Sequence, residues 1–255
     1  MYPVLFHIGG VPAETYYAIW LVALSLALAW IVRRFPGYGI DDDEGRRVVG
    51  RGFIGMLVGA RAFELIWNFP VYWNDPSLIL DLSRGGLAEV GALCGALAAV
   101  AALCWRNHRI SFNRLCDACT PPIFFALALG RWGCFFAGCC VGIPSAFPTA
   151  LHFPYDPPDV VRHPTQLYYA FFAAAALALL LWAERKIANQ DRRWPLMPLG
   201  FLLYAAMRLS IDLLRDEGGK GFLLSHGIIY AGLPVALLWL LAPRAFLKGG
   251  KADDG

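Results

Sequence analysis

The sequence predicts an all-α, polytopic membrane protein with about seven transmembrane helices, and three observations support this fold class. Of the 255 residues, 58% are hydrophobic and 16% are charged, whereas soluble domains contain about 45–50% apolar and about 25% charged residues. Apolar runs recur along the chain, and basic residues gather in alternate connections. This composition excludes a disordered chain, a coiled coil and an ordinary soluble enzyme. The net charge of +3 is small, and we expect no nucleic-acid partner.

The predicted spans follow from the apolar runs, each close to the roughly 20 residues that cross the hydrocarbon as a helix. Helices are favoured because backbone groups in lipid must be hydrogen-bonded internally. The first run follows a segment without the pattern of a cleavable signal peptide, so we expect it to stay in the mature protein. The second run carries Arg61 and Glu64. In chain order, the predicted spans cover residues 15–32, 48–66, 87–105, 116–137, 166–184, 197–214 and 226–242.

The distribution of Lys and Arg predicts the orientation of these spans. Fifteen of these residues lie in the connections after the first, third and fifth spans and in the C-terminal tail, against four in the other connections. Because cytoplasmic loops carry the excess of basic residues, we expect the N-terminus outside and the C-terminus in the cytoplasm. The outer loop 138–165, rich in Pro and aromatic residues, is expected to form an ordered cap. We expect residues 1–255 to form a single integral membrane domain.

Four arginines are expected near the outer ends of three spans. Arg61 lies toward the outer end of the second span, and Arg131 lies in the outer part of the fourth. Arg208 and Arg215 flank the outer end of the sixth. Guanidinium groups bind phosphate in a bidentate manner and keep their charge, so we interpret this set as a site for a phospholipid head group. The alternative is that each arginine pairs with a carboxylate or extends to the interface.

Two further segments at the predicted outer surface are candidates for the same site. The run from Gly130 to Gly142 contains four glycines, which allow the backbone to leave a helix and approach a ligand closely. Close packing of helices through small residues is the alternative. His163 precedes the fifth span and is a candidate base, ligand or simple polar contact.

The cysteines fall into groups on opposite sides of the predicted membrane. Cys116 and Cys119 lie near the cytoplasmic side, whereas the outer group consists of Cys134, Cys139 and Cys140. A zinc site needs about four converging ligands, so we expect no metal. A disulfide or a redox activity of the outer group stays open, because the outer face is oxidising in bacteria.

Five stretches in order, over about residues 55–245, resemble the prolipoprotein diacylglyceryl transferases of bacterial inner membranes. The expected topology is also similar to that of this family. The stretches are Gly59-Ala60-Arg61 with Trp67-Asn68-Phe69-Pro70 and Asn74-Asp75-Pro76, then Gly85-Gly86-Leu87 with Gly91-Ala92-Leu93-Cys94-Gly95, then Gly130-Arg131-x-Gly133 with Phe135 and Gly142, then His163-Pro164-x-Gln166-Leu167-Tyr168, and finally Arg208-x-x-x-Asp212-x-x-Arg215.

The resemblance implies a reaction, a location and partners. Members of the family transfer diacylglyceryl from phosphatidylglycerol to the thiol of a lipobox cysteine in a prolipoprotein, which forms a thioether and releases glycerol phosphate. The resemblance implies a multi-pass protein of the bacterial inner (plasma) membrane, with its active site toward the periplasmic side. Its expected partners are membrane lipid and the prolipoprotein signal peptide, and no cofactor is expected.

The resemblance also implies roles for the matched residues. Carried over by position, Arg131 would bind the phosphatidylglycerol head group. Arg208 and Arg215 would stabilise the charge on the leaving phosphate. The residues expected to support these groups or to shape and line the cavity are Arg61, Gly133, Gly142, His163 and Tyr168.

The sequence departs from the family pattern at the polar positions expected near the thiol. Cys134 and Cys139 stand where the family usually has Asn and Glu, and Tyr169 stands where a Glu ends the fifth-span motif. Val90 replaces the family's proposed base, a His or Tyr, and cannot move a proton. The candidates to replace that base are Glu89 and His163.

These departures leave alternative functions open. One is a transferase that uses the same phospholipid donor with a different acceptor. Another is a membrane thiol–disulfide oxidoreductase that uses the outer cysteines. A third is a lipid-binding or transport protein without chemistry, which would bind phospholipid and release no glycerol phosphate.

Overall fold

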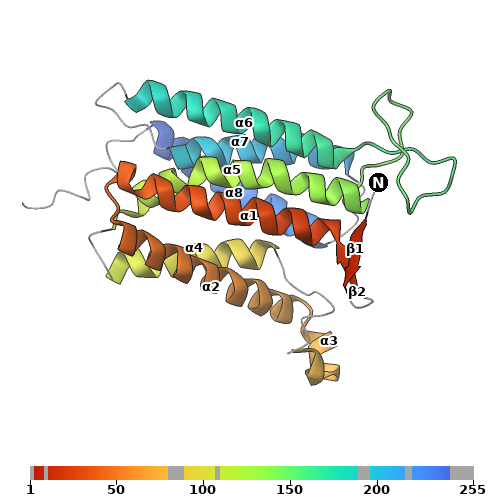
Figure 1. Ribbon diagram of the computed structural model, residues 1–255, viewed down its shortest axis with the longest axis horizontal. Helices are drawn as coiled ribbons and strands as arrows, with labels where there is room; N and C mark the ends of the chain where they lie inside the picture. Colours follow the sequence, from red (N-terminus) through yellow and green to blue (C-terminus); the bar gives the residue numbers. More distant parts are fainter. Residues whose placement is uncertain are drawn as a thin grey trace, which may run out of the picture. The chain divides into compact units, whose positions relative to one another are not determined.

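The computed structural model describes residues 3–8, 11–79, 89–106, 110–188, 196–215 and 220–241. Within these ranges the elements are helical apart from one N-terminal hairpin, in which β1 (Val4–Ile8) pairs antiparallel with β2 (Val11–Glu14) (Figure 1). The predicted all-α class is therefore confirmed, and the hairpin is an addition that the apolar runs did not indicate. The chain divides into two compact units, residues 1–31 with 116–255 and residues 32–115. Each is described by itself.

A helix lies over each of the seven ranges predicted from the sequence. The longer helices are α1 (Thr15–Arg34), α2 (Asp42–Trp67), α4 (Glu89–Arg106), α5 (Phe112–Ala137), α6 (Thr165–Ala188), α7 (Leu196–Ile211) and α8 (Lys220–Leu241). The shorter elements are α3 (Phe69–Asn74) and the 3₁₀ turns Phe35–Tyr38, Pro76–Ile79 and Asp212–Leu214.

Among the described residues, four stretches are long and apolar enough to cross a membrane, which identifies a multi-pass membrane protein. In the described part of the chain, α2 is not among them, and it carries Arg61 and Glu64 between its apolar residues. Two further apolar stretches, Gly91–Arg106 and Ile229–Leu238, are shorter. The four long stretches are Thr15–Tyr38, Phe112–Ala137, Thr165–Lys186 and Leu196–Leu214.

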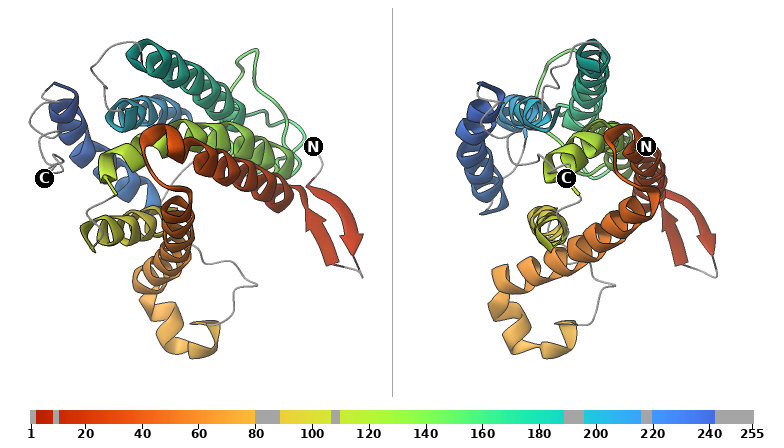
Figure 2. Two further views of the ribbon diagram at one scale, coloured as in Figure 1. Left: turned by 60° about the vertical axis from the view of Figure 1, so that its left-hand side comes forward. Right: turned by 90° about the vertical axis from the view of Figure 1, so that its left-hand side faces the viewer.

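The unit that contains α5, α6 and α7 is held together by a shared apolar core. Phe124 of α5, Leu180 of α6 and Met207 of α7 are each almost fully buried in this core. α1 packs on α5, because the ring of Trp20 lies against Gly130, where a Cβ would come within 2.7 Å of the ring. Figure 2 shows α1 beside α5, and α6 beside α7.

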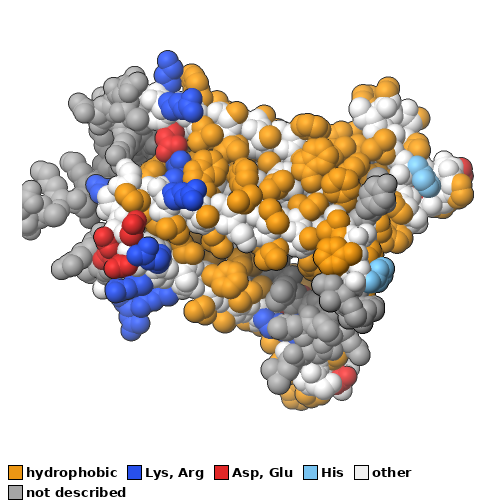
Figure 3. All heavy atoms as spheres, in the orientation of Figure 1, with side chains coloured by type: hydrophobic (Ala, Val, Ile, Leu, Met, Phe, Trp, Pro, Cys, Tyr) orange, Lys and Arg blue, Asp and Glu red, His pale blue; other side chains and the backbone are white. Residues whose placement is uncertain are grey.

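The long helices α1 and α6 end in basic residues, and the loop between α5 and α6 precedes the start of α6. α1 and α6 run in the same direction, and their last turns hold Arg33 and Arg34 and then Arg185 and Lys186 (Figure 1). Hydrophobic side chains cover the length of both helices, and Lys and Arg gather at the end where they finish (Figure 3). Apolar sides with cations at one end are typical of helices that cross a membrane.

The loop 138–164 is ordered by its own contacts, as the sequence predicted for a cap. Arg162 forms an ion pair with Asp156, with Nε 2.8 Å from Oδ1, and it exchanges two backbone hydrogen bonds with Leu151. Phe153 is 1% exposed. The loop is therefore a structured segment at the N-terminal end of α6.

In the unit 32–115, α2 and α4 pack through glycines on both helices. A Cβ added at Gly59 would lie 2.3 Å from the carbonyl oxygen of Gly91, and one added at Gly55 would lie 2.5 Å from that of Gly95. Real Cβ atoms do not approach backbone oxygens this closely, so only glycine permits this spacing. Such contacts between small residues are typical of helix pairs in membranes.

Replacing Gly59 by alanine is expected to destabilise the protein, because the added methyl group forces α2 away from α4 at a cost of about 1–3 kcal/mol. Gly50 is the matched control on the same helix, since a Cβ there meets nothing within 4 Å. Gly50→Ala is expected to be neutral or stabilising, because alanine is the better helix former by up to about 1 kcal/mol. Thermal unfolding of the two variants in detergent measures the difference, and equal shifts would contradict the glycine contact.

Candidate functional site

Three arginines surround the ring of one tyrosine at the end of the helices next to the loop 138–164. The guanidinium carbon of Arg131, on α5, is 4.4 Å from the ring centre of Tyr169, on α6. The guanidinium carbons of Arg208 and Arg215 are each 5.9 Å from the same centre. These distances are within the range of cation–π attraction, which is strengthened where the groups are desolvated.

One carboxylate joins these groups. Asp212 lies 2.9 Å from Nε of Arg208 through Oδ2 and 4.0 Å from Nη1 of Arg215 through Oδ1. The Tyr169 hydroxyl donates a hydrogen bond to Oδ1 of the same carboxylate. We call Arg131, Tyr169, Arg208, Asp212 and Arg215 the arginine cluster.

The local sequence explains how α7 and the 3₁₀ turn that follows it bring three members of the arginine cluster together. Arg208 and Asp212 are four residues apart, so they share a helix face. The helix tightens into a 3₁₀ turn at Asp212–Leu214, and Arg215 has extended backbone with φ −88° and ψ 142°. This change of path directs the chain past the loop, where Arg215 pairs with Gly142 in an isolated antiparallel bridge.

The arginine cluster has a positive formal charge in a buried setting. It holds three guanidinium groups and one carboxylate, and the exposed fractions are 7% for Arg131, 6% for Arg208 and 3% for Asp212. Buried arginines stay ionised, so the cluster has a net positive charge that attracts anions. The attraction is strong because the cluster itself lies in a low-dielectric environment. A phosphate or phosphodiester group matches both the charge and the planar donors of guanidinium groups.

Gly142 fixes the loop against the arginine cluster. Its amide donates to the carbonyl oxygen of His163 at 2.9 Å, and the amide of Ile143 donates to that of Leu214 at 2.9 Å. A Cβ at Gly142 would lie 2.5 Å from the Leu214 oxygen. Only glycine therefore allows the loop to pass beside the residue that precedes Arg215.

The other sequence-predicted residues of this unit lie in the loop or between helices. His163 Nδ1 is 3.2 Å from the Tyr168 hydroxyl, which is 2.5 Å from Oγ1 of Thr149. These contacts place His163 of the loop and Tyr168 of α6 in one polar group where the loop meets the helix. Gly133 faces α1, and a Cβ there would lie 3.2 Å from the Tyr16 carbonyl oxygen.

Two of the predicted site residues, Arg61 and Glu89, belong to the unit 32–115. Arg61 donates to the carbonyl oxygens of Leu78, at 2.5 Å, and Ile79, at 2.9 Å, and lies over the ring of Tyr72. Its convergence on the arginine cluster stays a prediction. Glu89 begins α4, and its side chain lies outside the described residues.

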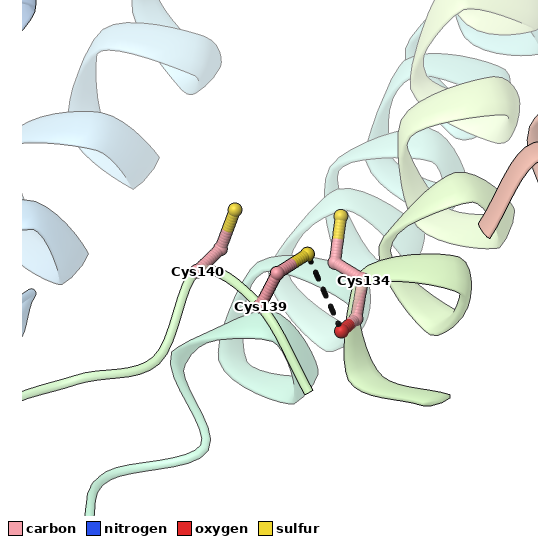
Figure 4. A group of neighbouring side chains, drawn as sticks. All are labelled: Cys134, Cys139 and Cys140. Carbon is pink, nitrogen blue, oxygen red and sulfur yellow. Dashed lines mark hydrogen bonds between the residues drawn. The ribbon is translucent and has the colours of Figure 1, made fainter. Parts of the chain in front are cut away.

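The three outer cysteines meet where α5 ends (Figure 4). The Sγ atoms of Cys134, Cys139 and Cys140 all lie within 4.8 Å of one another, and each is a free thiol. The thiols of Cys134 and Cys139, through hydrogen bonds, and the guanidinium group of Arg215 lower the pKa of Cys140. The loop thus brings a thiolate-favouring group beside the arginine cluster.

Sequence reasoning missed the central position of Tyr169. It selected the neighbouring Tyr168, whose hydroxyl contacts His163 instead. The two side chains are about 100° apart around the helix, so only one of them faces α7. The sequence signal that could have identified Tyr169 is the Glu that the family usually has at this position. An acidic residue there indicates that the side chain contacts the arginines.

The comparisons with known proteins agree with the resemblance. The model of the prolipoprotein diacylglyceryl transferase family matches residues 3–245. A phosphatidylglycerol–prolipoprotein diacylglyceryl transferase of Vibrio parahaemolyticus is 31% identical, over 99% of this chain and 93% of its own. The proteins of the same name from Photobacterium profundum and Clostridium tetani are 31% and 28% identical, over 95% and 85% of this chain and 94% and 86% of their own.

Two substitutions at Tyr169 separate its ring from its hydroxyl. Tyr169→Phe removes the hydrogen bond to Asp212, at a cost of about 1–3 kcal/mol, and keeps the ring against Arg131. Tyr169→Leu removes both, so it is expected to be less stable by a further roughly 1–2 kcal/mol for the lost cation–π contacts. Denaturant titration in detergent micelles measures the order, and equal stability of the two variants would contradict the role of the ring.

Proposed function

Because the chain belongs to the prolipoprotein diacylglyceryl transferase family, we propose that it transfers diacylglyceryl from phosphatidylglycerol to the lipobox cysteine of a prolipoprotein. The acceptor sulfur forms a bond to the glyceryl carbon, and the bond from that carbon to the phosphate oxygen breaks. The product is a thioether, and glycerol phosphate leaves. The arginine cluster is the observation that carries this proposal, because the reaction needs cations at the phosphate of the donor and of the leaving group.

The donor half of the reaction follows from the arrangement of the arginine cluster. Arg131 binds the phosphodiester, the role that the family resemblance gives to this position, and its buried guanidinium group lies against the ring of Tyr169. Arg208 and Arg215 stabilise the negative charge that increases on the leaving phosphate. Asp212 holds these two groups in place before the substrate binds, so little reorganisation is needed during the reaction.

The remaining predicted residues have supporting roles in this proposal. Gly133 and Gly142 allow the backbone to approach its neighbours closely, and Tyr168 lines the cavity. Arg61 supports the phosphate contacts. The base that receives the acceptor proton is Glu89 or His163, and His163 is already hydrogen-bonded to a tyrosine hydroxyl.

We propose that the protein crosses the bacterial inner membrane seven times as a single domain, with the N-terminus outside and the C-terminus in the cytoplasm. The basic last turns of α1 and α6 support this orientation, because basic residues stay on the cytoplasmic side. The arginine cluster lies at the opposite end, beside the loop 138–164. The active site then opens toward the periplasm, where the lipobox cysteine and the outer leaflet are accessible.

A turnover assay with purified protein tests this function. Protein in detergent is mixed with phosphatidylglycerol and a lipobox-cysteine peptide, and glycerol phosphate release and peptide mass are followed. The expected result is one diacylglyceryl group per peptide and an equal amount of glycerol phosphate. Release without peptide modification would indicate a different acceptor. Neither signal from folded protein would overturn the proposal.

In this assay Arg131→Ala is expected to lower turnover by about 10²–10³-fold, the typical effect of removing one group that stabilises the reacting charge. Arg46→Ala is the matched control, because Arg46 lies on the surface and pairs with Asp43 at 2.6 Å. Exposed pairs contribute about 0–1 kcal/mol, so this variant should keep the wild-type rate. Equal losses in the two variants would contradict the assignment of Arg131.

The orientation is tested by thiol labelling in spheroplasts. A membrane-impermeant maleimide is expected to label Ala146→Cys, in the exposed loop, above the wild-type background in intact spheroplasts. Lys186→Cys, in the last turns of α6, is expected to add to this background only after the membrane is opened. The reverse pattern would invert the topology and place the arginine cluster on the cytoplasmic side.

A further inference from the structure

The thiol group beside the arginine cluster has the composition and spacing of a metal site. Cys134 is 3% exposed, Cys139 is half-buried and Cys140 is exposed. Three thiolates around a tetrahedral Zn²⁺ at about 2.3 Å are separated by roughly 3.8 Å. The Sγ atoms all lie within 4.8 Å of one another, which is close to this spacing. Figure 4 shows the three side chains at the end of α5 and in the turn that follows it.

The backbone that carries these thiols is held by buried side chains of α6. Oγ1 of Thr165 donates to the carbonyl oxygen of Cys140 at 2.7 Å, and Nε2 of Gln166 donates to that of Cys139 at 2.5 Å. Both donors are 0% exposed. Cys140 adopts φ +58°, a conformation that non-glycine residues rarely adopt without such support. The ligand positions are therefore fixed before any ion binds.

The charges around the cysteines suit a thiolate–metal complex. Zn²⁺ with three thiolates has a net charge of −1, which is costly to bury alone. Arg215 interacts with Cys140, and Arg131 interacts with Cys134. The arginines thus balance the charge of the complex, as they would balance the charge of a phosphate.

We propose that Cys134, Cys139 and Cys140 bind one Zn²⁺ ion through three thiolates, and that its fourth position takes the thiol of the acceptor cysteine. Three protein ligands with one open position are the arrangement of catalytic rather than structural zinc. The expectation of no metal rested on four protein ligands, and an open site needs only three. The acceptor part of this proposal rests on the proposed function.

The open position supplies a way to activate the acceptor where Val90 replaces the usual base. A metal-bound thiol loses its proton. The acceptor thiol displaces a zinc-bound water, its proton passes to the proposed base, Glu89 or His163, and its sulfur takes the vacated position. The sulfur then forms the bond to the glyceryl carbon, and the phosphate oxygen departs with the electron pair of the broken carbon–oxygen bond.

Metal binding is tested independently of turnover. Full-length protein is reduced, freed of metal with a chelator and dialysed against buffered Zn²⁺, and zinc per chain is measured by mass spectrometry. Titration with Co²⁺ reports thiolate ligands through sulfur-to-metal charge-transfer absorption. The expected result is one ion per chain. We expect Cys134→Ser, Cys139→Ser and Cys140→Ser each to weaken binding at least roughly tenfold, since each removes one of three ligands.

The control is Cys116→Ser with Cys119→Ser, a pair at the other end of α5, which should leave binding unchanged. Thermal unfolding establishes that each variant is folded, and wild-type protein is measured in parallel for a disulfide by intact mass. Binding that is absent in folded wild-type protein, binding that survives all three substitutions, or a disulfide that forms in place of the complex would each overturn the zinc site.

The fourth position is tested with the Co²⁺ complex. Adding a lipobox-cysteine peptide is expected to increase the charge-transfer absorption, and the same peptide with serine is expected to leave it unchanged. An unchanged spectrum with both peptides would overturn the acceptor position and leave the metal site standing. Turnover that persists with metal removed would overturn the zinc-bound acceptor and leave the proposed function standing. Zinc binding without any turnover would overturn the proposed function, and the acceptor position with it, and leave the metal site standing.

Discussion

The carboxylate of Asp212 allows Arg208 of α7 and Arg215, which follows the 3₁₀ turn, to be buried at the end of a membrane helix bundle. Moving a charge from water into a protein interior costs several kcal/mol, and Arg208 and Asp212 are 6% and 3% exposed. The ion pair between them offsets part of this cost, and the Tyr169 hydroxyl contributes a hydrogen bond to the same carboxylate. α6 and α7 are therefore joined at this end by a charged centre, the Asp212 carboxylate with its partners Arg208 and Tyr169, in addition to their apolar packing.

This centre also determines the path of the chain on both sides of it. Beyond Asp212, the 3₁₀ turn gives way to extended backbone at Arg215, which pairs with Gly142 of the loop. The start of α6 holds the same loop from the other side through Thr165 and Gln166. One ordered loop therefore connects the arginine cluster with the thiols at the end of α5, so the two sites share a scaffold within a single unit of the chain.

The elements that the sequence predicted well depend on local pattern, and those that it missed depend on three-dimensional contact. Apolar runs of membrane length identified a helix at each predicted range, because a segment in lipid has few alternatives. The spacing of Arg208 and Asp212 placed them on one helix face. The choice between Tyr168 and Tyr169 depended on how α6 is rotated against α7, and no property of these residues alone encodes that rotation. The meeting of the outer cysteines depended on a backbone turn at Cys140, a residue that seldom adopts positive φ.

The two sites differ in the chemistry that they select. The guanidinium groups of the arginine cluster are matched to hard oxygen anions, and their charge does not change with pH in the physiological range. The cysteines are matched to soft partners, which include thiophilic metals and, through a metal, another thiol. A reaction that joins a phospholipid to a cysteine needs one group of each kind, close together and not competing for the same ligand. The replacement of Asn and Glu by cysteines, which the resemblance indicates at positions 134 and 139, changes the thiol side of such a site while the phosphate side keeps its arginines.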